Sequence, residues 1–198
     1  ADRLGAAGYT RRGGKSLTPR MDELAGRGVW FRRAWAQAPN TPRSFPSIFL
    51  SRFPSQIAWE GKHLNYPIVK AENQSLWEAL SDAGYRTAGV SSHFYFTDKQ
   101  GIRQGFAEYD NEGALDIAGS NHDIASPRVV PRATAKLAEL AAGKQRFALF
   151  VHLFEPHSTY MTHPEFPIEG KGTEGLEEKY DYEIAYVDRW VGELVDAV

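Results

Sequence analysis

Thr41 is the residue of this sequence best placed to act as a hydroxyl nucleophile. It lies in residues 38–54, which read APNTPRSFPSIFLSRFP. The aromatic and β-branched segment before it, GVWFRRAWAQA, predicts a strand, and Ser44 to Phe49 predicts the first turns of a helix. The unpaired N–H groups of such a helix start favour an anion. A hydroxyl between the two elements would therefore face an anionic group, although Thr41 could instead cap the helix.

Two histidines follow other predicted strands and could bind an anion or transfer a proton. His93 comes after the strand 85–90, and His157 comes after the strand 147–153. Carboxyl ends of parallel strands meet at one edge of a sheet, so we expect Thr41, His93 and His157 to share that edge. His152 lies inside the predicted strand and is interpreted as structural. The remaining histidines, His63, His122 and His163, have no supporting context.

The elements around these residues alternate between helix and strand. We predict helices after Thr18-Pro19, over 75–84, over 132–142 and from about Leu176 onward. The last helix carries one apolar stripe: Tyr180, Ile184, Val187, Val191, Leu194 and Val198. Residues 106–131 are polar and are interpreted as a surface excursion. This order predicts an α/β fold, a mainly parallel sheet with helices on both faces, within one domain of 198 residues.

Composition excludes several classes of protein. The chain has no cysteine, so disulfides, a thiolate nucleophile and cysteine-bound zinc are excluded. No apolar run approaches the roughly eighteen residues of a membrane span. Residues 1–43 hold nine Lys/Arg against three Asp/Glu, whereas residues 165–198 hold three against ten. The basic third could attract an anionic substrate or be neutralised by the acidic helix, but its scattered bases do not favour nucleic acid.

Several segments, in order, resemble the sulfatase-like branch of the alkaline phosphatase superfamily over nearly the whole chain. They are ADRLGAAGY, LTPRMDELAGRGVWFRRAWAQAPNT, SIFLSRFP, GYRTAGVSSHF, QGFAEYDN, FALFVHLFEPHSTY and YDYEIAYVDRWVGEL. Thr41 precedes Pro54 by thirteen positions, as the nucleophile of that family does. The resemblance implies an alkaline phosphatase-like sandwich, incomplete at both ends of this chain.

The resemblance also implies roles for individual residues. Thr41 would be the nucleophile, its oxygen bound to a divalent metal ion (Ca, Mn, Zn or Mg) that activates the hydroxyl. His93 would contact the substrate, and His157 would contact the transferring group or protonate the leaving oxygen. Arg43 would clamp an oxyanion or simply lie on the surface. Ser44, in SFPS, imitates a serine-type signature, but its spacing to Pro54 argues against it.

The sequence departs from the family in two ways. Formylglycine-dependent members need a cysteine or serine where Thr41 stands, so an ordinary threonine ester would have to be cleaved by water. Members with threonine often act on phosphodiesters. The resemblance places the remaining metal ligands, a carboxylate before Ala1 and an Asp-His pair after Val198, outside the chain. Asp2 resembles a structural aspartate. We therefore expect this chain alone to be inactive.

Three functions follow as alternatives. The first is a metal-dependent hydrolase of sulfate or phosphate esters, acting on a small anionic ester. The second is a transferase that moves a phospho-group from a lipid to a glycan, tethered to the membrane through an upstream region. The third is a binding domain without catalysis. The family resemblance also favours an extracytoplasmic or membrane-anchored location.

Overall fold

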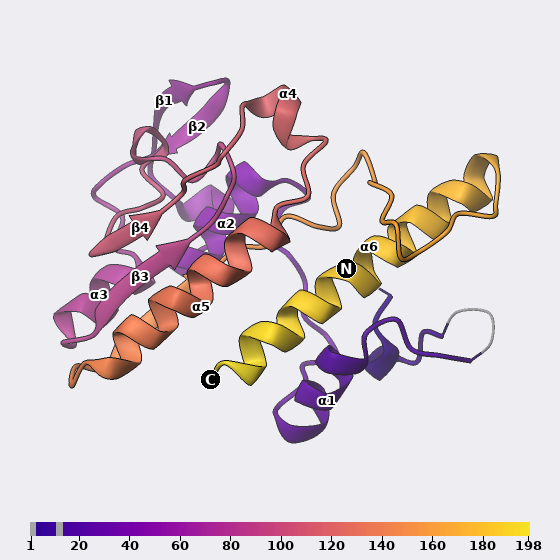
Figure 1. The fold of residues 1–198 in the computed structure, drawn as a ribbon. Coiled ribbons are helices and arrows are strands. Elements are labelled where there is room, and N and C mark those ends of the chain that lie inside the picture. The colour runs from indigo at the N-terminus through magenta and orange to yellow at the C-terminus, as the bar shows by residue number, and fades with distance from the viewer. Residues whose placement is uncertain (1–2, 11–13) are drawn as a thin grey trace. The chain divides into compact units, whose positions relative to one another are not determined.

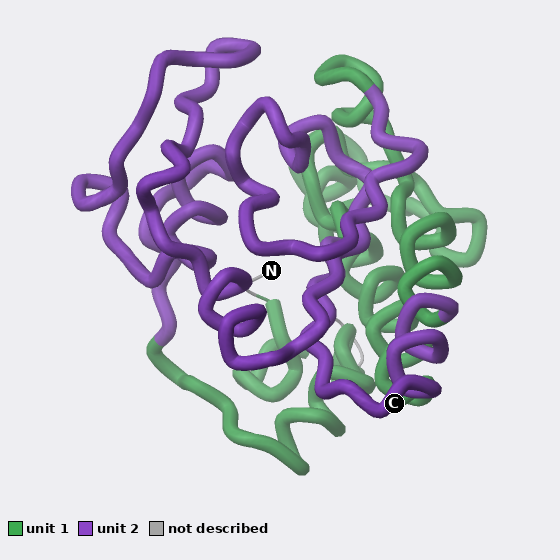
Figure 2. The backbone as a smooth tube through the Cα atoms, turned by 90° about the vertical axis from the view of Figure 1, so that its left-hand side faces the viewer, with its two compact units in different colours: residues 1–33, 116–134, 153–198 green, residues 34–115, 135–152 purple. Residues whose placement is uncertain are grey.

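The computed structural model describes residues 3–10 and 14–198 (Figure 1), and the chain forms two compact units (Figure 2). Unit 1 comprises residues 1–33, 116–134 and 153–198, and unit 2 comprises residues 34–115 and 135–152. Helix α5 (Ser126–Ala142) contributes to both. Asp2 lies outside the described residues. No helix in the described part of the chain has the length and apolar character of a membrane span.

Unit 2 is built on a parallel sheet of three strands in the order β4-β3-β5. The central strand β3 (Arg86–Val90) pairs in parallel with β4 (Glu108–Asp110) and with β5 (Phe147–Val151). Four of the five β3 residues are buried, as expected for a parallel strand covered on both faces. The predicted α/β fold with a parallel sheet is confirmed. Strand β5 ends two residues before the predicted end.

Helices cover both faces of this sheet. Phe150 of β5 packs against Phe45 and Phe49 of helix α2 (Thr41–Leu50), with ring centroids 6.0 and 4.9 Å apart. Side chains alternate along a strand, and Arg86 of β3 points the other way, to Glu139 of α5, at 2.5 Å. Helix α3 (Leu76–Asp82) lies on the α2 side, because its Trp77 ring is 5.9 Å from that of Phe150.

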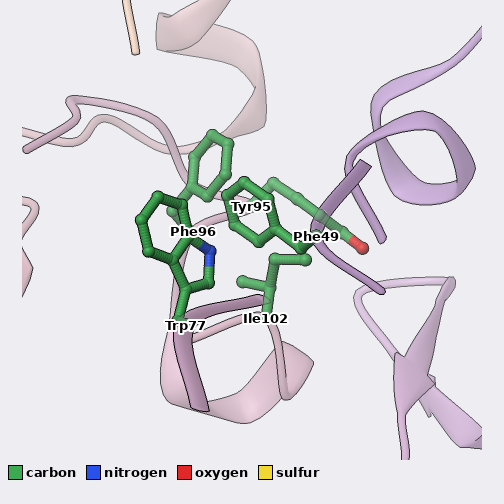
Figure 3. Packing of buried hydrophobic residues seen from close by; sticks show 5 residues of the cluster. All are labelled: Phe49, Trp77, Tyr95, Phe96 and Ile102. Atoms are coloured by element: carbon green, nitrogen blue, oxygen red, sulfur yellow. The ribbon is translucent and has the colours of Figure 1, made fainter. Parts of the chain in front are cut away.

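The core of unit 2 is largely aromatic (Figure 3). Its buried members are Phe49, Trp77, Tyr95, Phe96 and Ile102. Trp77 stacks on Phe106 at 4.2 Å, and its ring is nearly perpendicular to that of Phe49 at 5.3 Å. Each such side chain contributes about 1.5–3 kcal/mol through burial. This cluster joins α2 and α3 to the segment that follows β3.

Gly89 in the middle of β3 allows a close approach of the neighbouring strand's side chain. A Cβ atom at this position would lie 2.4 Å from the ring of Tyr109, which pairs with Gly89 in register. The Phe106 ring would be 3.2 Å away. Any larger residue would therefore force Tyr109 out of its place over the central strand.

Unit 2 also contains elements that the sequence analysis did not predict. Strands β1 (Trp59–His63) and β2 (Tyr66–Val69) form an antiparallel hairpin. Leu64 and Asn65 connect them with φ of 51° and 64°, as in a two-residue turn with left-handed backbone. Two short 3-10 helices complete the unit, η2 (Pro54–Gln56) and η3 (Asp98–Gln100).

The strand predicted over residues 28–38 is wrong. These residues form bends, and Val29, Phe31 and Trp35 are 83%, 75% and 73% exposed. Within the described residues no strand pairs with this segment, so its N–H and C=O groups have no ladder to join. The helix predicted from Ser44 instead begins at Thr41. Aromatic and β-branched residues alone therefore did not make a strand.

Unit 1 is organised by the long helix α6 (Gly172–Asp196). Its other elements are η1 (Gly5–Ala7), α1 (Pro19–Arg27), α4 (Ile117–Ser120) and the first part of α5. Helix α5 begins six residues before the predicted start and contains Pro131. Of the predicted apolar stripe, Ile184 and Val187 are buried, whereas Val198 is 96% exposed.

Three acidic side chains on α6 are buried and tie other segments to the helix. Asp181 accepts hydrogen bonds from Arg3 at 2.7 Å and from the Tyr9 hydroxyl at 3.0 Å. Asp188 accepts the N–H groups of Arg20 and Met21, at 3.0 and 2.9 Å, and so caps the start of α1. The third is Glu183, described below.

The acidic helix also neutralises part of the basic N-terminal region. Arg3 pairs with Asp181, and the side chain of Arg20 pairs with Asp196. These contacts agree with the interpretation of the N-terminal charge as a partly neutralised surface. The alternative was that the basic N-terminal third attracts an anionic substrate. Because Arg3 and Arg20 are paired, these two arginines are not free to do so.

Candidate active site

Thr41 is the first residue of α2 and is half-buried. Asn40 before it is the N-cap residue, and its backbone carbonyl accepts the N–H groups of Arg43 and Ser44 at 3.3 and 2.9 Å. Thr41 therefore does not cap the helix. Among the described residues its hydroxyl takes part in no hydrogen bond, and it lies at the positive end of the helix dipole. A hydroxyl in this position suits attack on an anionic ester.

Two other candidates lie on the same helix. Ser44 is three positions after Thr41, so the two hydroxyls lie on neighbouring turns of one face. Arg43 is exposed, and its guanidinium lies 5.8 Å from the centre of the Trp59 ring. The anion-clamping role of Arg43 stays a prediction, as does the preference for Thr41 over Ser44.

The loop that carries His93 is held by one network around the half-buried Asn111. The Asn111 amide oxygen accepts the N–H of His93 at 3.0 Å and the hydroxyl of Ser91 at 2.6 Å. Its nitrogen donates to the carbonyls of His93 and Phe96, at 3.0 and 2.9 Å. One side chain thus makes four hydrogen bonds, using both the donor and acceptor ends of the amide.

The His93 ring has a defined tautomer. Its Nδ1 accepts the N–H of Tyr95 at 3.3 Å, so a neutral ring carries its hydrogen on Nε2. The side chain is only 4% exposed, and the ring lies 4.4 Å from that of Phe94. In this state His93 can donate a hydrogen bond to an anion through Nε2.

The structure joins the Thr41 helix to the His93 loop within unit 2. The Tyr95 hydroxyl donates to the carbonyl of Pro42 at 3.3 Å, and the rings of Phe45 and Phe96 are 5.0 Å apart. Burial raises the pKa of Tyr95, so its phenol remains a donor at all ordinary pH values. The first turn of α2 is therefore fixed to the loop that follows β3.

His152 is a neighbour of this site that the sequence analysis set aside as structural. It lies one residue after β5 rather than inside it, and its N–H donates to the Val90 carbonyl at 3.0 Å. Its ring is 5.7 Å from that of His93 and 5.2 Å from that of Phe45. The sequence signal that could have identified His152 as a site residue is its place close to the carboxyl end of the predicted strand 147–153.

His157 belongs to unit 1 and is exposed. Its ring stacks on Phe154 at 4.4 Å, and its Nδ1 lies 2.6 Å from the carbonyl oxygen of Ser158. A carbonyl only accepts, so Nδ1 carries the hydrogen and Nε2 of a neutral ring is an acceptor. His157 thus presents a basic nitrogen, the reverse of the tautomer assigned to His93.

A buried carboxyl group lies beneath the His157 loop. Glu183 is 1% exposed and accepts the N–H groups of His157 and Met161, at 3.3 and 2.9 Å. Burial first, and the charge of Glu155 in addition, raise the pKa of Glu183 to about 7 against the opposing effect of the two N–H groups. Glu155 is itself buried and accepts both the N–H and the hydroxyl of Ser126.

The remaining histidines are placed as follows. His163 is 3% exposed, stacks on Tyr186 at 3.9 Å and lies 4.0 Å from Glu183. Burial lowers the pKa of His163, so the ring is neutral near pH 7. His63 is half-buried in β1, and His122 is exposed. The sequence offered no signal for the place of His163 beside a buried acid.

No metal centre is assembled by the part of the chain that the structure describes. Residues 3–10 and 14–198 contain no group of three His, Asp or Glu side chains that could hold an ion. A divalent cation needs several such ligands. These residues therefore do not fit a metal by themselves.

A parallel sheet covered by helices, with a hydroxyl at a helix start and a histidine beyond the central strand, defines the class of the chain as an α/β protein. The chain belongs to the sulfatase family, whose model, described as Sulfatase, matches residues 1–198. No curated protein matches the chain significantly.

Solved structures share the fold. The C-terminal periplasmic domain of EcEptC from Escherichia coli, in complex with Zn, has a TM-score of 0.70 at 16% identity and aligns with 98% of this chain and 55% of its own. The lipoteichoic acid synthase LtaP from Listeria monocytogenes has a TM-score of 0.68 at 20% identity, covering 94% and 47%. Ps i-CgsB in complex with k-i-k-neocarrahexaose has 0.67 at 19%, covering 99% and 52%. The chain spans about half the length of these structures.

Proposed function

We propose that this chain carries the nucleophile and two anion-handling histidines of a sulfate or phosphate ester hydrolase. The observation that carries the proposal is the link between the start of α2 and the His93 loop, made by the Tyr95 hydroxyl and the Pro42 carbonyl at 3.3 Å. It ties the helix start that carries the Thr41 hydroxyl to the loop of His93, whose tautomer leaves Nε2–H to donate to an anion. Family membership supports the same reaction class.

The reaction would run in two steps. The Thr41 hydroxyl gives its proton to solvent water as its oxygen attacks sulfur or phosphorus and forms a threonine ester, while the bond to the leaving alcohol breaks. His93 donates a hydrogen bond to an oxygen of the transferring group, and His157, when protonated, gives its proton to the leaving oxygen. Water then attacks sulfur or phosphorus, releases sulfate or phosphate and restores the Thr41 hydroxyl. Arg43 would bind a further oxygen of the anion.

We propose in addition that the whole enzyme uses a divalent metal ion, because an unassisted threonine hydroxyl is a weak nucleophile. Thr41 would be the only ligand from this chain, and the other ligands would come from sequence that flanks it. EcEptC was solved with Zn, which supports a metal of this kind. The described residues do not complete such a site, so the steps above use only side chains of this chain.

The experiment is turnover of an aryl phosphate and an aryl sulfate by the protein with its flanking sequence. Thr41→Ala should reduce kcat by at least about a thousandfold, since the nucleophile is lost. Ser44→Ala, the matched change one turn later, should leave kcat within a few fold. Mass spectrometry of a quenched reaction should find the transferred group on Thr41. Full turnover by the Thr41→Ala variant would contradict the proposal.

A second candidate function is transfer of a phospho-group to a glycan hydroxyl instead of water. The observation that favours it is the likeness to the LtaP synthase and to the EcEptC periplasmic domain. A glycan acceptor added to the assay distinguishes the two: product on the glycan indicates a transferase, and free phosphate or sulfate indicates a hydrolase. Absence of both reactions, with binding retained, would indicate a binding domain.

The 198-residue chain alone is the last arm of this experiment. We expect it to show no turnover of either ester, because its described residues supply no complete set of metal ligands. Turnover by the chain alone would contradict the part of the proposal that assigns the other ligands to flanking sequence.

A further inference from the structure

We propose that Glu183 is a positioning residue for His157: from helix α6 its carboxyl group fixes the backbone of the loop that carries the exposed imidazole. The inference rests on the proposed function in one respect, the participation of His157 in the chemistry. The contacts that support it lie wholly within unit 1.

The geometry of the loop makes Glu183 its central support. Its two carboxyl oxygens accept different N–H groups, Oε2 that of His157 at 3.3 Å and Oε1 that of Met161 at 2.9 Å. Between them, the N–H of Thr159 donates to the Asn121 carbonyl at 3.1 Å. One carboxyl group therefore spans the five residues 157–161, whose side chains at 157–159 are exposed.

Both ends of the loop are anchored separately, which leaves its middle to Glu183 and to the hydrogen bond from Thr159 to Asn121. At the start, the buried Glu155 accepts the N–H and hydroxyl of Ser126, at 3.1 and 2.7 Å. After the loop, the buried ring of His163 stacks on Tyr186 at 3.9 Å. Within the described residues, the His157 ring stacks on Phe154 and hydrogen-bonds the Ser158 carbonyl, both of which are close to it in the sequence. Its direction is thus set through the backbone that Glu183 holds.

The charged groups that face Glu183 give this support a dependence on pH. Glu155 is a like charge, and His163, at 4.0 Å, is neutral near pH 7 because burial lowers its pKa. His163 in turn is influenced by Glu165 and Arg189, which act in opposite directions on it. No described cation pairs with the Glu183 carboxylate. Burial raises the pKa of Glu183 to about 7 from its ordinary 4.5.

The sign of the pH effect follows from linkage. When the loop opens, Glu183 returns to water and its pKa falls toward the ordinary value, so the closed loop binds the proton more tightly. Opening is therefore hardest when Glu183 is protonated and becomes easier as pH rises toward 7, with little further change above it. The side-chain amide of a Glu183→Gln variant does not titrate, so the loop of that variant should lose this dependence.

The test is amide hydrogen exchange of the whole chain, read as protection factors that correct for the intrinsic effect of pH. In Glu183→Ala, protection at the His157 and Met161 amides should fall about tenfold each, the value of one lost hydrogen bond. In the wild type, protection at both should decrease by tenfold or more between about pH 5 and 8. In Glu183→Gln this decrease should vanish.

The matched control is Glu178→Gln on the same helix. Glu178 also accepts two loop N–H groups, those of Glu169 and Gly170 at 2.8 Å each, but that loop carries no proposed functional group. The control should keep wild-type protection and its pH dependence at His157 and Met161. Protection unchanged in both Glu183 variants overturns the proposal. If the Ala variant does not fold, the result for the Gln variant alone decides the outcome.

Turnover of the enzyme with its flanking sequence separates this inference from the proposed function. Glu183→Gln should lower kcat with little change in KM and should alter the pH profile, and it should add nothing in a His157→Ala background. If His157→Ala itself keeps full activity, the proposed function of His157 fails whatever the exchange data show. If His157→Ala is impaired and Glu183→Gln is not, the positioning role is overturned.

Discussion

The loops that carry His93 and His157 are each held by hydrogen bonds to a single side chain, an amide in the first and a carboxyl group in the second. In unit 2, the Asn111 amide donates two hydrogen bonds and accepts two, and it has no proton to gain or lose near neutral pH. In unit 1, the Glu183 carboxyl group only accepts when ionised, and burial moves its pKa to about 7. An amide gives a support that is insensitive to pH, whereas a buried acid gives one that pH can loosen.

The imidazoles differ in a matching way. His93 is buried and directs Nε2–H as a donor, which suits holding an anion. His157 is exposed and keeps its hydrogen on Nδ1, which leaves Nε2 to take and give a proton. Holding an oxygen requires a fixed donor, and proton transfer requires contact with the leaving group. The buried and exposed placements fit these two proposed tasks.

The largest expected effect on stability comes from removing the Asn111 amide that holds the His93 loop. Asn111→Ala leaves buried partners at Ser91, His93 and Phe96 without a hydrogen bond, and should lower the free energy of unfolding by about 2–4 kcal/mol. Asn111→Asp should also destabilise, because a carboxylate cannot donate to the two carbonyls. Urea unfolding of both variants measures this. A loss below about 0.5 kcal/mol would show that Asn111 is not the main support of the loop.

The next effect concerns the pH dependence contributed by Glu183. Its pKa is raised in the folded state, so the folded chain binds more protons than the unfolded chain between about pH 4.5 and 7. The free energy of unfolding should therefore fall as pH rises through this window, by an amount on the order of 1–3 kcal/mol for this group. Urea unfolding across the window should show a flatter profile for Glu183→Gln. An identical slope in that variant would contradict the assignment.

The smallest effect comes from the ion pairs of unit 2, which titrate with the opposite sign. Hydrogen bonds from Lys136 and Arg86 lower the pKa of Glu108. This group stabilises the fold above its ordinary pKa, and that contribution is lost as pH falls below it. Its side chain is 35% exposed, so Glu108→Gln should cost less than about 1 kcal/mol, and less still in high salt. A cost that persists in high salt would mean that burial, rather than charge, dominates.

Local signals in the sequence predicted the frame of unit 2 well. Ser75 and Glu78 form the capping box of α3, and Gly84, with φ of 83°, follows its end. Strand β3 begins one residue later than predicted and ends at the same Val90. These elements depend on neighbouring residues, which a sequence displays directly. The expected family and fold are likewise confirmed.

The supports of the two loops could not be predicted, because they depend on distant residues. Asn111 lies in a segment read as a polar surface excursion, and only the register of β4 beside β3 brings it to His93. Glu183 sits next to Ile184 on α6, where the apolar stripe was predicted but a buried acid was not. A charged residue on an amphipathic helix normally faces solvent. The residues whose N–H groups donate to Glu183 lie more than twenty positions before it in the sequence.

The absence of a side chain at Gly89 has a consequence for the history and engineering of this domain. The ring of Tyr109 occupies the space that any Cβ at position 89 would need. Residue 89 therefore cannot be enlarged on its own: a mutational library that changes only position 89 should be depleted of survivors, whereas paired changes that also shrink residue 109 should be recovered.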